Sequence, residues 1–179
     1  MKALVVVDMQ NDFITGSLGT PEAQAIVPNV KKKIKEYREN GDLIVFTRDT
    51  HHREYLDTKE GEKLPVEHCI VYSWGWEIAD GLRCDDEHVV NKGTFGSNNL
   101  VRHLAHEFWH GGNGHFTEIE LVGLCTDICV VSNALLLKAT FYNDCEITVD
   151  ATCCAGVTPE THEAALRTME MCQINVKRG

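Results

Sequence analysis

Residues Glu120–Val130 of this 179-residue chain read ELVGLCTDICV and mark the junction between a strand and a helix. The apolar run IELVGL predicts a buried strand, and TDICVVSNALLLKA, which follows it, predicts a helix. A tight turn between them carries Cys129 into the first turn of that helix. Backbone N–H groups there have no intrahelical partner, and the helix dipole favours negative charge, so a thiolate is stabilised. Cys129 is therefore a candidate nucleophile.

Short apolar stretches alternate with amphipathic ones on either side of this junction. Six of them predict strands: KALVVV at 2–7, LIVFT at 43–47, HVVN at 88–91, EIELVGL at 118–124, EITV at 146–149 and a last one near 173–176. Helices are predicted from Pro28 to a stop at Gly41, after a cap at Ser97, and from Thr158-Pro159-Glu160. This alternation predicts an α/β fold, a doubly wound and mostly parallel six-stranded sheet with helices on both faces.

Length and composition fit one domain that spans residues 1–179. Hydrophobic residues make up 43% of the chain, enough for a buried core, and the net charge of −10 argues against a site for a phosphate backbone. The N-terminus lacks the long apolar segment of a signal peptide, and no apolar run approaches the length of a membrane span. We therefore expect a cytoplasmic protein without nucleic-acid or membrane partners, in which the eight cysteines are mostly reduced.

The stretch at about 49–87 interrupts the alternation, because it shows no strong periodicity. Connections in compact domains have a median of about 4–6 residues, and much longer ones are usually functional or disordered. Disorder is disfavoured here by four aromatic residues, which are Tyr55, Tyr72, Trp74 and Trp76. We interpret the stretch as an ordered insertion that carries function. The sequence leaves open whether the two tryptophans line a pocket or contact another subunit.

Three polar residues follow predicted strands at corresponding places. Asp8 closes the first strand, Lys92 follows HVVN, and Cys129 follows the strand at 118–124. If these strands are neighbours, the three side chains meet at the carboxyl ends of the strands, where such folds bind ligands. A carboxylate can take the thiol proton and an ammonium can hold the thiolate, which suits acyl transfer. The competing interpretation makes Asp8 and Lys92 strand caps and Cys129 a packing residue.

The insertion holds residues of the types that bind metals. Candidate ligands for Zn²⁺, Fe²⁺ or Mn²⁺ are Asp49, His51, Glu60 and His68. Other residues compete with them, and spacing does not choose among the alternatives His52, Glu54, Asp57 and Glu67. A polar surface loop without metal is the competing interpretation. A second group, His103, His106 and His110, shares a helical face, but a solvated surface is favoured there because no carboxylate or thiol completes a set.

Three motifs together resemble the isochorismatase-like cysteine hydrolases, in their nicotinamidase/pyrazinamidase branch. They are MKALVVVDMQNDF, the lone Lys in NKGTFGS, and GLCTDICV, and the similarity spans essentially the whole chain. The resemblance implies the Rossmann-like α/β fold of that family. It also implies that Asp8 is the general base, Lys92 the stabilising cation and Cys129 the nucleophile. By the same resemblance Leu124–Cys125 is a cis peptide, the N–H groups of Cys125 and Cys129 form an oxyanion hole, and Phe13 is an aromatic wall against the substrate ring.

The resemblance also bears on the metal. Members of this branch hold a divalent ion with an Asp-x-His pair, a third His or Glu, and a later His, which correspond here to Asp49, His51, Glu60 and His68. In that branch the pyridine nitrogen binds the metal. Two segments depart from the family pattern: residues 64–67 (LPVE) lack the usual aromatic residue before the last His, and Tyr72-Ser73 replaces a small Gly-Thr pair.

The implied activity is deamidation of a small aromatic carboxamide, with nicotinamide converted to nicotinate and ammonia through a cysteine thioester, in NAD salvage. A related cysteine hydrolase of another small amide or carbamoyl compound is the alternative. A catalytically silent binding or assembly module is a third hypothesis, which the complete set of Asp8, Lys92 and Cys129 disfavours. Proteins of this fold often form homo-oligomers, and the residues themselves do not test that state.

Overall fold

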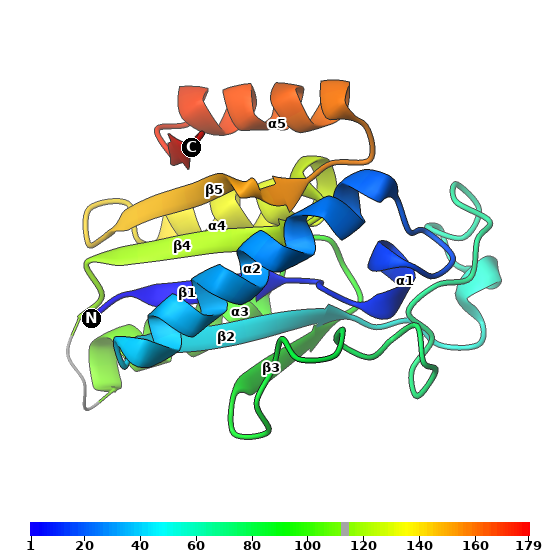
Figure 1. Cartoon of the computed structure of the whole chain (residues 1–179), viewed down its shortest axis with the longest axis horizontal. Helices are drawn as coiled ribbons and strands as arrows, with labels where there is room; N and C mark the ends of the chain where they lie inside the picture. The colour runs from blue at the N-terminus through cyan, green and yellow to red at the C-terminus, as the bar shows by residue number, and fades with distance from the viewer. Residues whose placement is uncertain (112–114) are drawn as a thin grey trace.

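A six-stranded parallel sheet forms the centre of the protein, in a computed structural model that describes residues 1–111 and 115–179. Its strand order is β3-β2-β1-β4-β5-β6, and every neighbouring pair is parallel (Figure 1). The strands are β1 (Ala3–Val7), β2 (Leu43–Asp49), β3 (His88–Lys92), β4 (Glu118–Leu124), β5 (Glu146–Ala155) and β6 (Asn175–Lys177). The predicted α/β fold with its doubly wound sheet is confirmed.

Helices cover both faces of this sheet. They are α2 (Pro21–Glu39), α3 (Asn98–His110), α4 (Val131–Thr140) and α5 (Pro159–Met171), whereas the short helix α1 (Asn11–Ile14) lies beyond the strand ends. Successive residues of β1 point to opposite faces. Val5 and Val7 belong to the core that contains buried residues of α3, α4 and α5, whereas Leu4 and Val6 belong to the core under α2. Figure 1 shows α2 across the front of the sheet, with α3 and α4 behind it.

The central strand β1 is completely buried, and its pairing explains the uninterrupted apolar run in the sequence. All five of its residues have no exposed surface. Val5 pairs with Val45 of β2 on one side and with Leu121 of β4 on the other. Both faces of a strand in such a position meet apolar layers, so polar residues have no place along it until it ends at Asp8.

Helix α2 begins earlier than the sequence predicts, at Pro21 rather than at Pro28. Thr20 is the cap, and its side chain accepts a hydrogen bond from the Ala23 N–H at 3.0 Å. Pro28 lies inside the helix, where its missing N–H deprives the Gln24 carbonyl of an intrahelical donor. Gln24 and Pro28 are both exposed, so water can bond to that carbonyl. The prediction was wrong because a proline on the outer side of a helix need not begin it.

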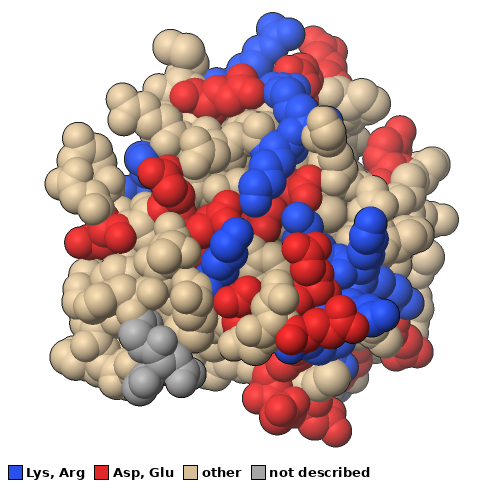
Figure 2. Space-filling model, turned by 60° about the vertical axis from the view of Figure 1, so that its left-hand side comes forward, with Lys and Arg blue, Asp and Glu red and all other residues tan. Residues whose placement is uncertain are grey.

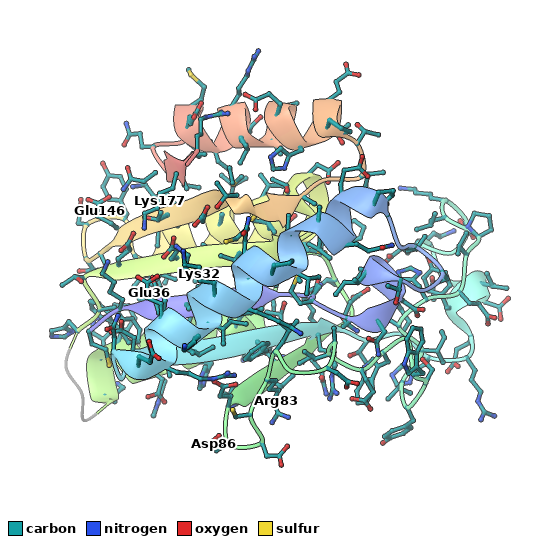
Figure 3. All side chains as sticks on the ribbon, viewed as in Figure 1. Lys32, Glu36, Arg83, Asp86, Glu146 and Lys177 are labelled. Carbon is teal, nitrogen blue, oxygen red and sulfur yellow. The ribbon has the colours of Figure 1, made fainter. Side chains whose placement is uncertain are left out.

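Residues 50–87 connect β2 to β3. Their first part lies with α1 beyond the carboxyl ends of the strands, and their last part, which includes Arg83 and Asp86, runs back to the start of β3 (Figures 1 and 3). This connection contains one short 3₁₀ turn, Tyr55–Asp57, and is otherwise made of turns. Two isolated bridges tie the connection down, one within it between His51 and Ile70, and one between Gln10 and Ile78. Tyr55 and Trp76 are buried within it. Its inner side is therefore held close to the strand ends.

Charges of both signs are mixed on the surface. Figure 2 shows Lys and Arg next to Asp and Glu across the middle of one face. Lys177 contacts Glu118 at 3.0 Å and Glu120 at 3.2 Å, and Lys2 contacts Glu118 at 2.7 Å. Lys32 and Glu36 extend from the outer side of α2 (Figure 3). The described residues include no helix that combines the length and apolar character needed to cross a bilayer.

Candidate active site

Asp8 follows directly after β1 and is completely buried. Its backbone has a φ of 48°, in the left-handed region that residues other than glycine rarely adopt. Thr47 of β2 holds it there by two hydrogen bonds: the Asp8 N–H donates to Thr47 Oγ1 at 3.2 Å, and the Thr47 hydroxyl donates to Asp8 Oδ1 at 2.7 Å. The other carboxylate oxygen, Oδ2, lies 2.7 Å from Lys92 Nζ. Neighbours on both sides thus fix the carboxylate.

Lys92 links Asp8 to Cys129. It is the last residue of β3, two strands away from β1, and it pairs in register with Asp49 of β2. Its Nζ donates a hydrogen bond to Cys129 Sγ at 3.4 Å and lies 3.6 Å from Asp49 Oδ1. One buried ammonium group therefore contacts both the carboxylate and the thiol. The structure brings together the three residues that the sequence places at strand ends.

A distorted turn between β4 and α4 positions Cys129. Gly123 has a φ of 116°, and a Cβ at this position would lie 2.1 Å from the Val7 carbonyl oxygen, so only glycine fits. The next peptide, Leu124–Cys125, is cis, as the resemblance implies. The Cys125 carbonyl then accepts hydrogen bonds from the N–H groups of Ile128 at 3.1 Å and Val130 at 3.0 Å.

The bond from Val130 back to Cys125 spans five residues, which makes Thr126–Val130 a π-helical turn. Cys129 lies in that turn, and α4 begins after it, at Val131. The sequence predicts that Cys129 lies in the first turn of an α-helix. The structure corrects this prediction, because Cys129 lies in a π-helical turn that precedes the α-helix. Single π turns are frequent at functional sites, and here the wider turn carries the thiol into the buried space beside Lys92.

Burial has the largest effect on the pKa values of Cys129 and Asp8. Burial raises the pKa of the Cys129 thiol well above its usual value; the Asp8 carboxylate adds to this rise, and Lys92 opposes it. Burial likewise raises the pKa of Asp8, so this carboxyl accepts a proton more readily than an exposed one. Burial therefore opposes the thiolate that the helix end favours, and Asp8 is placed to accept the thiol proton.

Burial and nearby charges also shift the pKa values of Lys92 and Cys125. Burial would lower the pKa of Lys92, but the attraction of Asp8, Cys129 and Asp49 outweighs it, so this pKa is raised and the ammonium stays charged. Burial raises the pKa of the Cys125 thiol to about 12, with Asp127 contributing. Cys125 is thus a protonated neighbour of the nucleophile candidate.

A second buried group lies at the end of β2. Ligand atoms of Asp49, His51 and His68 all lie within 4.8 Å of one another. His51 Nε2 is 3.0 Å and His68 Nε2 is 3.6 Å from Asp49 Oδ2. Glu60 faces the same centre, since its Oε1 lies 3.6 Å from His51 Nε2 and 3.9 Å from His68 Nε2. The structure brings the four predicted ligands together.

The hydrogen bonds of this group fit a divalent cation. His68 Nδ1 lies 2.8 Å from the Val66 carbonyl, which can only accept, so the proton is on Nδ1 and Nε2 offers its lone pair to the centre. The His51 Nε2 atom is buried and has no hydrogen-bond partner among the described residues. Burial would raise the pKa of Asp49, but neighbouring groups that include the Lys92 ammonium outweigh it and hold this pKa well below its usual range. Two imidazoles and carboxylates of this kind suit Zn²⁺.

The competing ligands do not reach this centre. His52, Glu54, Asp57 and Glu67 are all exposed, whereas Asp49, His51 and His68 are buried. The neighbouring side chains of His51 and His52 point in opposite directions, so His51 is buried and His52 is exposed. The other His-rich group is divided as well: His106 and His110 of α3 are exposed, and His103 stacks on His88 of β3 with ring centroids 3.8 Å apart.

A cavity of about 530 Å³ joins the two groups. Its lining includes Cys129 and Cys125 on one side and the metal-facing residues Asp49, Glu60 and His68 on another. Phe13 lines it too, with its ring centroid 5.7 Å from that of His68. Trp74 and Trp76 are not part of the lining: Trp74 is exposed, and Trp76 packs under Arg48, whose guanidinium lies 3.3 Å from its ring centroid.

Sequence reasoning missed two residues that support the site. Thr47 holds Asp8, as described above. Gln10 is completely buried and holds the backbone of Asp49: its side-chain amide donates to the Asp49 carbonyl at 2.9 Å, and its Oε1 accepts from the Asp49 N–H at 2.7 Å. The one available signal was a polar residue inside or directly after an apolar strand, but that signal does not specify a partner.

Replacing Thr47 by Val tests the support of Asp8. This change removes the hydroxyl with little change in shape and leaves two buried polar groups of Asp8 without that partner. We expect the free energy of unfolding, measured by urea denaturation, to fall by about 1–3 kcal/mol. The matched control is Thr168→Val on the exposed side of α5, for which a change within about 0.5 kcal/mol is expected. Equal losses in the two variants would contradict this account of Thr47.

Comparisons with known proteins agree with the site. The isochorismatase domain model matches residues 2–177. The chain is 31% identical to a probable inactive nicotinamidase of Arabidopsis thaliana over 98% of this chain and 90% of that protein. It is 26% identical to the nicotinamidase of Saccharomyces cerevisiae over 75% and 80% of the two chains. The crystal structure of the pyrazinamidase of Pyrococcus horikoshii in complex with zinc superposes with a TM-score of 0.82, at 29% identity and 99% coverage of both chains. This chain belongs to the isochorismatase family of hydrolases, in its nicotinamidase branch.

Proposed function

We propose that this protein hydrolyses a small aromatic carboxamide, with nicotinamide as its substrate, through a thioester on Cys129. The observation that carries the proposal is the pair of contacts made by Lys92, at 2.7 Å to Asp8 and 3.4 Å to Cys129, beside a cavity large enough for a substrate. A carboxylate, an ammonium and a thiol in one buried site are the parts that acyl transfer requires. The product would be nicotinate and ammonia.

The first half of the reaction forms the acyl-enzyme. Asp8 takes the proton of the Cys129 thiol, and Sγ attacks the carboxamide carbon while Lys92 stabilises the developing thiolate. The tetrahedral intermediate places its negative oxygen at the N–H groups of Cys125 and Cys129, which serve as the oxyanion hole. Asp8 then gives its proton to the amide nitrogen, the C–N bond breaks, and ammonia leaves the thioester behind.

The second half releases the acid. A water molecule enters where ammonia left, and Asp8 accepts one of its protons as the oxygen attacks the thioester carbon. The C–S bond breaks, Cys129 regains a proton, and the carboxylic acid departs. The raised pKa of Asp8 suits both halves, since the same group must accept and return a proton in each.

Binding of the ring is assigned to Phe13 and to the metal-facing residues. Phe13 presents its ring to the cavity near His68. Asp49, His51, Glu60 and His68 would hold a divalent ion, for which we propose zinc. When bound there, the ion supplies a Lewis-acid contact for a ring nitrogen. The zinc complex of the Pyrococcus horikoshii pyrazinamidase supports this assignment.

The Arabidopsis relative is named a probable inactive nicotinamidase. In the present chain Asp8, Lys92 and Cys129 are all present and in contact. The site therefore has the groups that turnover requires. A silent binding module would have no need of a buried lysine between a carboxylate and a thiol, an arrangement that is costly to bury.

Replacement of Cys129 by Ala tests the proposed activity. With nicotinamide as substrate, we expect ammonia release to fall by at least about 10³-fold, because the variant lacks the sulfur that contacts Lys92 and forms the acyl-enzyme. The matched control is Cys172→Ala, which changes an exposed thiol far from the cavity lining and should retain activity. Ammonia release by the Cys129→Ala variant at the wild-type rate would exclude the nucleophile assignment.

Removal of His51 tests the metal assignment. Wild-type protein freed of metal should bind close to one zinc ion per chain, measured by calorimetry and elemental analysis. His51→Ala should weaken this binding by more than about 100-fold, since even loss of an outer-shell partner reduces metal affinity about 10–100-fold. His110→Ala on exposed α3 is the control and should bind zinc as the wild type does. Unchanged zinc affinity in His51→Ala would rule out the proposed site.

A further inference from the structure

The cavity is larger than a single-ring carboxamide requires. Its volume is about 530 Å³. Cavities of about 300–1,000 Å³ hold drug-sized ligands. A ring seated between Phe13 and the metal-facing residues, with its amide at Cys129, would leave part of this space unfilled.

The unfilled part has its own walls. The reactive and metal-facing residues come from the ends of β1 to β4 and from the connection at 50–87. A further part of the lining comes from the segment that leads into α2, from the first turn of α2 and from the turn between β5 and α5. It includes Leu18, Ala23 and Val157. Thr20 is a polar member of this wall, and its hydroxyl oxygen already accepts the Ala23 N–H as the cap of α2. These walls offer apolar contacts to a ligand.

The exposed lining of the cavity includes three apolar side chains beside the cationic Lys59 and Lys63. Leu64, Phe95 and Val157 all line it and expose 38%, 47% and 52% of their surface, respectively. Isolated exposed apolar side chains are normal, but three around one cavity mark a surface that a ligand covers. They come from three separate connections and line the same cavity.

The wall at Val157 is rigid and is tied to the turn that carries Cys129. The Val157 N–H donates to both carboxylate oxygens of Asp127 at 3.1 Å, and His162 Nδ1 lies 2.8 Å from Thr126 Oγ1. Gly156 leaves no room for a side chain, since a Cβ there would lie 2.9 Å from the backbone of His162. The apolar wall thus has a fixed position relative to the nucleophile, as a subsite needs.

From this arrangement we propose that the cavity contains an apolar subsite, and that the preferred substrate is an aromatic carboxamide with an apolar substituent on its ring. This inference rests on the proposed amide hydrolysis and specifies its substrate. The amide carbon lies at Cys129, the ring lies against Phe13, and the substituent extends to Leu18, Ala23 and Val157 under the rim of Leu64 and Phe95. Removal of the substituent from water then contributes to binding in the transition state.

The test compares kcat/KM for ammonia release from nicotinamide and from its 4-phenyl, 5-phenyl and 6-phenyl derivatives, using the full chain with zinc. We expect at least one phenyl derivative to exceed nicotinamide by about tenfold or more, since a phenyl group gains that much when it leaves water. If all three fall below nicotinamide, the subsite is overturned while amide hydrolysis stands. If no amide is hydrolysed, the proposed function fails and the subsite fails with it.

Two variants locate the subsite. Val157→Ser and Leu18→Ser each remove apolar surface from its wall, and each should lower the ratio of kcat/KM for the best phenyl derivative to that for nicotinamide by about tenfold. Met171→Ser changes a side chain that is 85% exposed on α5 and should leave the ratio unchanged. An unchanged ratio in both wall variants would overturn the placement of the substituent.

Discussion

The ammonium group of Lys92 is the interaction on which the site depends. It is buried, and the desolvation of a charge is costly unless opposite charges and hydrogen bonds offset it. Asp8 at 2.7 Å and Asp49 at 3.6 Å supply the opposite charge, and Cys129 Sγ accepts a hydrogen bond. Without Lys92, the fully buried carboxylate of Asp8 would lose its cation and the Cys129 thiolate its stabilising partner. The positions of these groups are therefore mutually dependent.

The sheet order makes these contacts available. Lys92 comes from β3 and Asp8 from β1, and Asp49 lies between them at the end of β2. Cys129 enters from the other side, after β4 and the turn at Gly123, where the strands approach too closely for any side chain. Because the strands are parallel, all their carboxyl ends lie at the same end of the sheet, which is the edge meant here. The metal-facing residues belong to the same edge, so a substrate can contact both groups from a single cavity.

Much of this was predictable from the sequence because the main signals are local. Continuous apolar runs mark strands buried on both faces, and the polar residues that end them, Asp8 and Lys92, lie at the edge where ligands bind. The choice of Asp49, His51, Glu60 and His68 over four neighbouring candidates came from family resemblance, and burial now separates the two sets. Thr158-Pro159-Glu160 begins α5 as predicted, because cap, proline and acidic first turn agree with one another.

Other features depend on contacts that are distant in the chain, and these were not predictable. The hydrogen bonds from Thr47 to Asp8 and from Gln10 to Asp49 each span 39 residues. The raised pKa of Cys129 follows from its burial beside Asp8, whereas the sequence indicated only a helix end that favours a thiolate. Two local features were missed as well: the π-helical turn, which has hydrogen bonds from Val130 to Cys125 and from Val131 to Thr126, and the start of α2, which depends on which of two prolines is capped.

The most direct test of the account is detection of the acyl group on sulfur. Samples quenched in acid during the first turnovers with nicotinamide should contain a nicotinoyl thioester, and mass spectrometry of the digested protein should place it on the peptide with Cys129. The account predicts that this adduct appears before steady state and disappears once substrate is exhausted. Full release of ammonia with no adduct at any time, or an adduct confined to another of the eight cysteines, would contradict it.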